Sequence, residues 1–313
     1  MNGAPIEPFS PLLSRVTDAA VVQFKPFKGN VPANIATLTE VFGQLASERA
    51  PQLIVLPEAA LTGYFLEGAV FELAMSAARF AETLQTAWQS AAGSDGRTVD
   101  VACGFFENDG GTFYNSGMYV TLGGSQPRIV HVHRKMFLPT YGVFDEERFV
   151  SRGRHLGVFP SVFGTAAILI CEDAWHAIMP TVAALKGARL LIVPSASPGR
   201  GLRADAELES VTRWKALLST YASEHGLYVV YASLTGFEGG KGMSGSSCVI
   251  SPSGAVVVAA PALGACILRV ALDVAEVEVA RATLPLLGDL AGVLPDLWFD
   301  EDLPLPKHRV ESD

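Results

Sequence analysis

The sequence predicts an α/β layered fold in which helices cover the outer faces of buried strands. Early in the chain, short apolar runs alternate with a segment that spaces its apolar residues like one face of a helix: Ile35, Leu38, Phe42 and Leu45. Several runs, such as LLIV at 190–193, are apolar at every position. This pattern is typical of strands that are covered on both faces.

The elements follow one another as short runs bounded by turn residues. Strands are expected at 19–24, 53–56, 99–106, 115–122, 127–136, 166–171, 190–193, 227–234, 246–251, 255–260 and 265–270. Helices are expected at 34–46, 66–92, 175–188 and 273–287, with one more that begins at Asp205 and ends before Gly226. A GGSQP turn between 115–122 and 127–136 predicts a hairpin.

The chain is long enough for a large core, because it has 313 residues, of which 49% are hydrophobic. Neither a linker nor an internal repeat divides it. We therefore expect residues 1–294 to form one domain. Residues 295–313 are rich in proline and acids, so we expect them to form an extended C-terminal tail.

Composition also restricts the partners. The net charge is −9 and no run is rich in Lys or Arg, so nucleic acid is not expected as a partner. No apolar run approaches the length of a transmembrane helix, and the N-terminus lacks the pattern of a secretory signal. Four cysteines lie far apart, as expected for free thiols in a reducing compartment: Cys103, Cys171, Cys248 and Cys266. We expect a cytoplasmic protein.

Reactive residues follow three apolar runs. LIVL leads into Glu58, AILI leads into Cys171 with two acids behind it, and LLIV leads into Ser195 and Ser197. In open α/β sheets, functional sites gather beyond the carboxyl ends of the strands. The three runs therefore predict one shared cleft.

Cys171 is the candidate nucleophile in this cleft, but its thiol must be activated by another group. Neighbouring acids make its thiolate harder to form, so it requires a base or a cation nearby. Glu58 is the candidate base and Lys135, after the strand at 127–136, is the candidate cation. Taken singly, each also fits a structural role: Cys171 as core filling, Glu58 as a cap, and Lys135 as a solvated charge.

Three separated motifs resemble the nitrilase superfamily of carbon–nitrogen hydrolases: LPEAALTGY (56–64), HRKMFLPTYGVFDEERF (133–149) and LICEDAWH (169–176). Three further segments resemble the same family less strongly: GFFE (104–107), YNS (114–116) and GMSGSSCVISPSG (242–254). The resemblance implies an αββα sandwich that dimerises into an αββααββα core. It also implies a Glu-Lys-Cys triad at Glu58, Lys135 and Cys171. A second glutamate falls on Glu146, with Glu147 as the alternative.

The resemblance implies that the protein is a thiol amidohydrolase, which cleaves a small carboxamide to an acid and ammonia. Such an enzyme needs neither a metal nor another cofactor. True nitrilases have Cys-Trp-Glu where this chain has Cys171-Glu172-Asp173. The motifs look most like the glutamine-amidase half of glutamine-dependent NAD synthetases, but the chain has no ATP-binding loop of the SGGxDS type. An N-carbamoyl amino acid hydrolase and a nitrilase remain alternatives.

Residues beside the motifs are candidates for the substrate pocket: Tyr64, Phe106, Tyr141, Glu172, Trp175, Ser195 and Ser197. The loop Gly199–Arg203 carries two arginines, which either bind a substrate carboxylate or are solvated. We expect a small-molecule amide as the substrate, and a homodimer or higher homo-oligomer.

Two other classes of protein are considered. A zinc hydrolase would use His131 and His133, which share one face of a strand, together with other residues: His155, His176 or Asp173. The alternative for this histidine pair is an exposed strand face beside Arg134. A non-catalytic scaffold is the other class, but all three triad residues are present in the chain.

Overall fold

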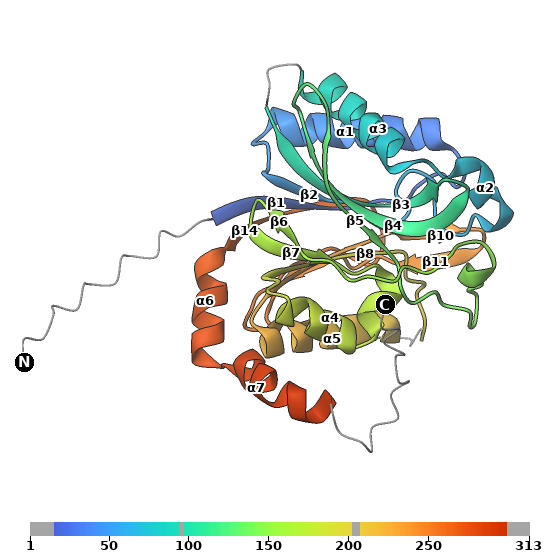
Figure 1. The fold of residues 1–313 in the computed structure, drawn as a ribbon. Coiled ribbons are helices and arrows are strands. Elements are labelled where there is room, and N and C mark those ends of the chain that lie inside the picture. The colour runs from blue at the N-terminus through green and yellow to red at the C-terminus, as the bar shows by residue number, and fades with distance from the viewer. Residues whose placement is uncertain (1–15, 94–96, 202–206, 299–313) are drawn as a thin grey trace, which may run out of the picture.

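Two six-stranded sheets pack face to face, and helices cover both outer faces (Figure 1). The computed structural model describes residues 16–93, 97–201 and 207–298. This arrangement is the αββα sandwich that the sequence predicts. The pairing of two copies into an αββααββα core stays a prediction.

The first sheet contains the N-terminal strands and one strand from the end of the chain. Its order is β14 (Cys266–Asp273), β1 (Val16–Gln23), β2 (Leu53–Val55), β3 (Val99–Asp109), β4 (Thr112–Leu122) and β5 (Arg128–Arg134). The pairs β1–β2 and β2–β3 are parallel, and the others are antiparallel. Helices α1 (Val31–Ser47) and α3 (Ala77–Ala92) cover its outer face.

The second sheet has the order β13 (Val256–Ala259), β12 (Cys248–Ile250), β9 (Tyr228–Ser233), β8 (Leu190–Ser195), β7 (Gly164–Ile168) and β6 (Phe159–Ser161). Its central strands β7, β8 and β9 are parallel. Helices α4 (Ile178–Leu185) and α5 (Glu209–His225) cover its outer face. A separate hairpin consists of β10 (Thr235–Glu238) and β11 (Lys241–Ser244).

Burial and capping explain these elements. Every residue of β2, β8 and β9 is buried, in line with their continuous apolar sequence. Helix α1 begins where the side chain of Asn30 accepts the backbone N–H of Ala33. Helix α5 ends at Gly226, which has a φ of 55° in the left-handed region that glycine adopts without steric cost.

Several expected helices are shorter or divided. The segment expected as one helix at 66–92 is divided into η1 (Glu67–Ala69), α2 (Val70–Leu73) and α3, because the side chain of Ser76 caps a new helix start. The expected helix at 175–188 begins only at Ile178. Asp205 lies outside the described residues, and α5 starts at Glu209.

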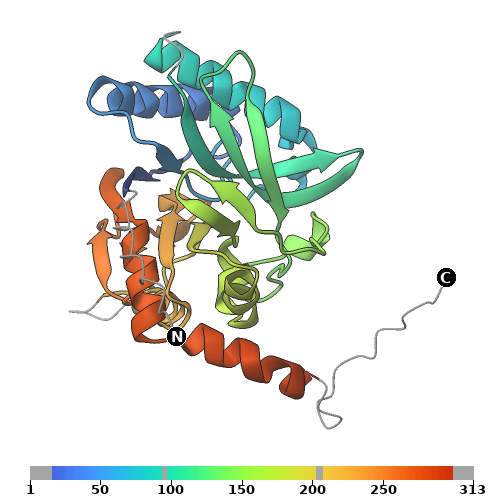
Figure 2. The ribbon, with the colours of Figure 1, turned by 60° about the vertical axis from the view of Figure 1, so that its left-hand side comes forward.

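The end of the chain also differs from the prediction. Instead of one helix at 273–287, two helices follow β14: α6 (Val274–Thr283) and α7 (Leu286–Trp298) (Figure 2). They are separated at Pro285, because proline has no N–H to continue the helix. The extended tail expected from Pro295 is wrong for residues 295–298, which belong to α7. Across 16–93, 97–201 and 207–298, every helix is too short or too polar to cross a membrane.

Candidate active site

The predicted reactive residues converge where strands of both sheets end. Glu58 follows β2, Lys135 directly follows β5, and Ser195 is the last residue of β8. Cys171 is not the end of a strand as predicted, because β7 stops at Ile168 and Cys171 begins the short 3-10 helix η3 (Cys171–Trp175). A further 3-10 helix, η2 (Glu146–Arg148), supplies the second glutamate.

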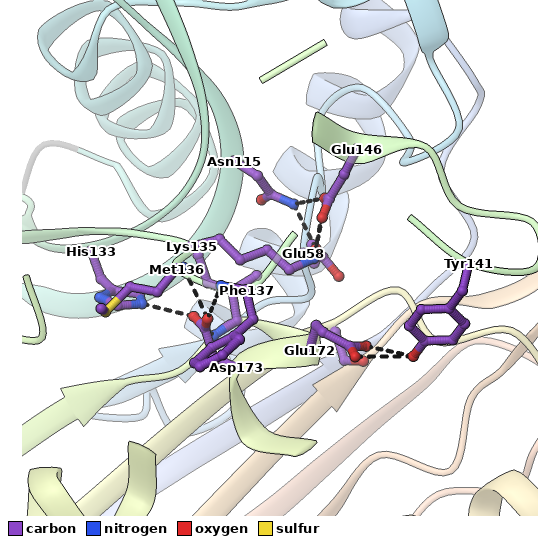
Figure 3. Close-up of polar contacts among 12 residues, drawn as sticks. Glu58, Asn115, His133, Lys135, Met136, Phe137, Tyr141, Glu146, Glu172 and Asp173 are labelled. Atoms are coloured by element: carbon purple, nitrogen blue, oxygen red, sulfur yellow. Dashed lines mark hydrogen bonds and ion pairs between the residues drawn. The ribbon is translucent and has the colours of Figure 1, made fainter. Parts of the chain in front are cut away.

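Lys135 is the centre of a buried charged cluster (Figure 3). Its Nζ lies 2.9 Å from Glu58 Oε1 and 2.9 Å from Glu146 Oε2. The amide nitrogen of Asn115 donates to Oε1 of both glutamates, at 2.7 Å and 2.6 Å. Glu147, in contrast, is exposed, so the second glutamate of the cluster is Glu146.

The charges of this cluster depend on one another. Burial alone would lower the pKa of Lys135, but the carboxylates of Glu146 and Glu58 hold this pKa well above its ordinary value. Burial raises the pKa of Glu146, and the charge of Glu58 raises it further, while Lys135 lowers it. Lys135 is therefore held as a cation between the two carboxylates.

Cys171 lies in a strained turn beside the cluster. Its φ is 44°, an uncommon left-handed conformation for a residue with a side chain. Burial and the charge of Glu58 raise the pKa of its thiol, whereas Lys135, the hydroxyl of Ser195 and the backbone of Ala196 lower it. The first two effects are dominant, so the resting thiol is protonated and requires a base to react.

Cys171 faces a cavity of about 320 Å³. Its lining residues are Tyr141, Phe144, Cys171, Glu172, Trp175, Ser197, Pro198, Arg200, Glu209, Ser210 and Arg213. The hydroxyl of Tyr141 donates to the carboxylate of Glu172, with oxygen distances of 2.9 Å and 3.0 Å. The guanidinium of Arg200 lies 5.6 Å from the ring centre of Tyr141. Two acids and two arginines thus meet in a cavity with aromatic walls.

The predicted pocket residues fall into three groups. Tyr141, Glu172, Trp175 and Ser197 line the cavity of Cys171. Ser195 is buried and approaches the hydroxyl of Tyr231 at 3.4 Å. Two other residues, Tyr64 and Phe106, line a neighbouring cavity of about 190 Å³ together with Glu146, and the ring centre of Tyr64 lies 5.5 Å from Lys135 Nζ.

Sequence reasoning missed some members of the site. Asn115 belongs to the short YNS match (114–116), which resembles the family but did not indicate a role for this side chain in the site. Glu209 and Arg213 lie in α5 and belong to no motif, so only the folded chain brings them to Cys171. Arg203, in the loop with two arginines, lies outside the described residues.

The histidines considered for a zinc site are engaged elsewhere. His133 Nε2 lies 2.9 Å from Asp173 Oδ2, and the rings of His131 and His176 stack on Phe159 and Phe137. In the part of the chain that the structure describes, no three His, Cys, Asp or Glu side chains are grouped to hold a metal ion.

The αββα sandwich and the charged cluster at its strand ends are those expected for a hydrolase of the nitrilase superfamily. Comparison with known families agrees: the chain belongs to the carbon-nitrogen hydrolase family, whose model matches residues 18–282.

Individual relatives add detail. The chain is 28% identical to a glutamine-dependent NAD(+) synthetase of Thermotoga maritima over 239 residues, which are 76% of this chain and 38% of the synthetase. It is 28% identical to a citrullinase of Francisella tularensis over 59% of this chain and 65% of that protein. A solved carbon-nitrogen hydrolase from Helicobacter pylori is 25% identical, with a TM-score of 0.76 over 90% of this chain and 98% of that one.

The chain spans about two fifths of the length of the curated synthetases that it matches. These matches confirm the resemblance to the synthetases that the CEDAW and PTYGVFDEERF motifs indicate.

Proposed function

We propose that the protein is a thiol amidohydrolase that cleaves the C–N bond of a small carboxamide to give an acid and ammonia. One observation carries the proposal: Cys171 lines an open cavity, while the buried Lys135 and Glu58 lie close enough for their charges to act on its thiol. A nucleophile, a base and a cation are the three groups that acyl transfer requires.

Acylation begins when Glu58 takes the proton of the Cys171 thiol and the sulfur attacks the amide carbon. The C=O π bond opens, and the resulting oxyanion is stabilised by Lys135 Nζ and the backbone N–H of Glu172. The oxyanion then collapses and the C–N bond breaks. Glu58 returns its proton to the leaving nitrogen, so ammonia departs and an acyl-thioester remains on Cys171.

Deacylation repeats these proton transfers with water. Glu58 takes a proton from the water molecule, whose oxygen attacks the thioester carbon, and Lys135 again stabilises the oxyanion. When the C–S bond breaks, the sulfur regains a proton from Glu58 and the carboxylic acid leaves. Glu146 and Asn115 keep Lys135 and Glu58 in place through both steps.

The charges of the cavity favour an amino acid that carries the amide on its side chain. Arg200 and Arg213 offer partners for an α-carboxylate, and Glu172 and Glu209 offer partners for an α-ammonium group. A cavity of about 320 Å³ is at the small end of ligand sites, which suits a single amino acid. The glutamine-dependent relatives support glutamine as the first substrate to test.

One match supports a second candidate. The relative named citrullinase is 28% identical, so hydrolysis of a ureido or N-carbamoyl group is the alternative reaction. The same nucleophile, base and cation would serve it, because a ureido carbon is also attacked to form a tetrahedral oxyanion.

The test is ammonia release from glutamine, asparagine, short aliphatic amides, citrulline, an N-carbamoyl amino acid and a nitrile. We expect release from an amide, and loss of that release in Cys171→Ala. Cys248→Ala is the matched control, because Cys248 is a buried thiol of β12 that lines no part of the cavity. Release by Cys171→Ala at the wild-type rate would exclude the thiol mechanism, and release from the nitrile alone would exclude the amidase.

A further inference from the structure

Asp173 joins the segment that follows Lys135 to the turn that carries Cys171 (Figure 3). Its Oδ1 accepts the backbone N–H groups of Met136 and Phe137, both at 2.9 Å. Its Oδ2 accepts the backbone N–H of Ile170 at 3.2 Å and the Nε2–H of His133 at 2.9 Å. One side chain therefore connects residues on both sides of the proposed active site.

This set of contacts, which we call the Asp173 clamp, is completely enclosed. The side chains of Asp173 and His133 have no solvent exposure. A carboxylate is an acceptor only, so its four bonds need four donors, and the clamp supplies three backbone N–H groups and one imidazole N–H. Such buried bonds to a charged group are strong, and breaking one leaves a donor or an acceptor unpaired.

The clamp acts at the two places that define the reaction geometry. Ile170 immediately precedes Cys171, and the backbone N–H of Asp173 returns a bond to Ile170 O at 3.0 Å, which closes the nucleophile turn. On the other side, Met136 immediately follows Lys135. Asp173 therefore joins the backbone beside Lys135 to the backbone beside Cys171.

We propose that Asp173, oriented by His133, is a positioning residue that holds Lys135 and the Glu172 N–H around the oxyanion formed at Cys171. This proposal rests on the proposed amidohydrolase function. Arg200, in the loop after β8, and Arg213, in α5, take no part in the clamp bonds, so we expect the clamp to act on the chemical step rather than on the charged groups offered to a substrate.

Asp173→Asn is the first variant to test. The side-chain NH₂ group of the asparagine is a donor, and it would face either the backbone N–H groups or His133, which are also donors. One side of the clamp would therefore lose its hydrogen bonds. Since a misplacement of about 1 Å can cost about 100-fold, we expect kcat to fall about 100-fold while KM for the accepted amide changes less than about twofold. Lys135 lowers the pKa of Cys171, so we also expect the rate–pH profile of Cys171 alkylation by iodoacetamide to move to higher pH.

Asp100→Asn is the matched control. Asp100 lies in β3 and accepts bonds from Tyr119 and Thr121 at 2.6 Å and 2.7 Å, so its variant also loses partly buried bonds to a carboxylate. We expect it to lower the unfolding temperature but to keep the wild-type kcat and alkylation profile. If Asp173→Asn behaves in the same way, the clamp has only a structural role and the proposal is wrong.

A second pair of variants covers the case in which Asp173→Asn does not fold. His133→Phe keeps a ring but removes one donor, and we expect a loss in kcat of about tenfold. His133→Gln restores an N–H donor and should recover part of the loss. Equal kcat in the three proteins would overturn the role of His133. If the wild type cleaves no amide, the proposed function fails, and the alkylation profiles still decide whether the clamp positions Lys135 at Cys171.

Discussion

Lys135 Nζ lies 2.9 Å from Glu58 Oε1, and neither side chain is exposed to solvent. Glu146 and Asn115 complete the same cluster, so two carboxylates share one ammonium group and one amide donor. In a buried site, the removal of one partner leaves the other charge without compensation. The stability of this cluster and its proposed chemistry therefore depend on the same bonds.

We predict that Lys135→Met costs about 3–5 kcal/mol of unfolding free energy, because it leaves two buried carboxylates without a cation. The double variant Glu58→Gln/Lys135→Met should be less destabilised than the sum of the single variants, since it removes one of the uncompensated charges as well. Urea unfolding monitored by circular dichroism measures all three, and none of them should release ammonia.

The matched control for this cycle is Lys215→Met. Lys215 pairs with Glu207 on the surface, where both side chains remain partly exposed, so its loss should cost less than about 1 kcal/mol. Similar costs for the buried and the surface lysine, or strict additivity in the double variant, would contradict the interdependence of the cluster.

Glu58 and Lys135 should have opposite effects on the reactivity of Cys171. Burial and the charge of Glu58 raise the pKa of the thiol, and Lys135 lowers it. Glu58→Gln should therefore lower this pKa and move the alkylation profile to lower pH, whereas Lys135→Met should move it to higher pH. Each displacement of one pH unit changes the thiolate fraction about tenfold below the pKa.

The measurement is the rate of iodoacetamide alkylation from about pH 6 to about pH 10, where the rate follows the small thiolate fraction below the raised pKa of Cys171. Cys171→Ala serves to subtract the other thiols. Glu58→Gln is the informative case, because its thiol should react faster while its turnover of the amide falls through loss of the base. A profile that moves in the same direction in both variants would contradict the assigned signs.

The position of the site was predictable because strand order brings carboxyl ends together. Glu58 and Cys171 follow apolar runs and Lys135 follows a strand-like stretch, so one cleft was expected, but the resemblance to the nitrilase superfamily, and not periodicity, joined the three as a triad. The end of β7 was not predictable, since Leu169 and Ile170 continue the apolar run although they lie beyond the strand. Periodicity does not distinguish a buried strand from a buried turn.

The residues that form the cavity walls were harder to predict from the sequence. Arg213 lies near the start of α5, where an arginine is expected on any solvated face, and only the packing of α5 against β9 and β12 directs it to the cavity. Tyr64 and Phe106 were expected at the pocket of Cys171 and line the adjacent cavity, in which Tyr64 lies beside Lys135. The motifs thus supplied part of the cavity wall, through Tyr141, Glu172 and Trp175, whereas Glu209 and Arg213 come from α5, which contains no motif.

Arg200 should recognise a substrate carboxylate. We predict that Arg200→Met raises KM for glutamine about 10- to 150-fold, the range expected when a hydrogen-bonded charge pair of about 1.5–3 kcal/mol is lost. The kcat/KM for a neutral amide such as butyramide should stay close to the wild-type value. Steady-state ammonia release with both substrates gives the comparison, and an equal loss for both would mean that Arg200 supports the cavity wall rather than a charged substrate.

Gly104 sets the distance between β3 and the turn that carries Glu58. A Cβ atom at this position would lie 2.5 Å from the Cα of Glu58 and 3.0 Å from the backbone nitrogen of Ala59. The backbone is already fixed there, because Gly104 N donates to Pro57 O at 3.1 Å and Gly104 O accepts from Ala60 N at 3.1 Å. A side chain would therefore push the Glu58 turn away from the strand.

We predict that Gly104→Ala costs about 1–3 kcal/mol of unfolding free energy through overpacking and lowers kcat at least about tenfold by displacing Glu58. The control is Gly43→Ala, because Gly43 lies within α1 and its Cβ would meet no atom within 4 Å apart from the adjoining backbone of its own helix. That variant should gain about 0.5–1 kcal/mol from better helix propensity and keep its activity. Urea unfolding and ammonia release separate the two effects: a Gly104→Ala protein that is destabilised but fully active would show that the Glu58 turn absorbs the added methyl group without moving its carboxylate.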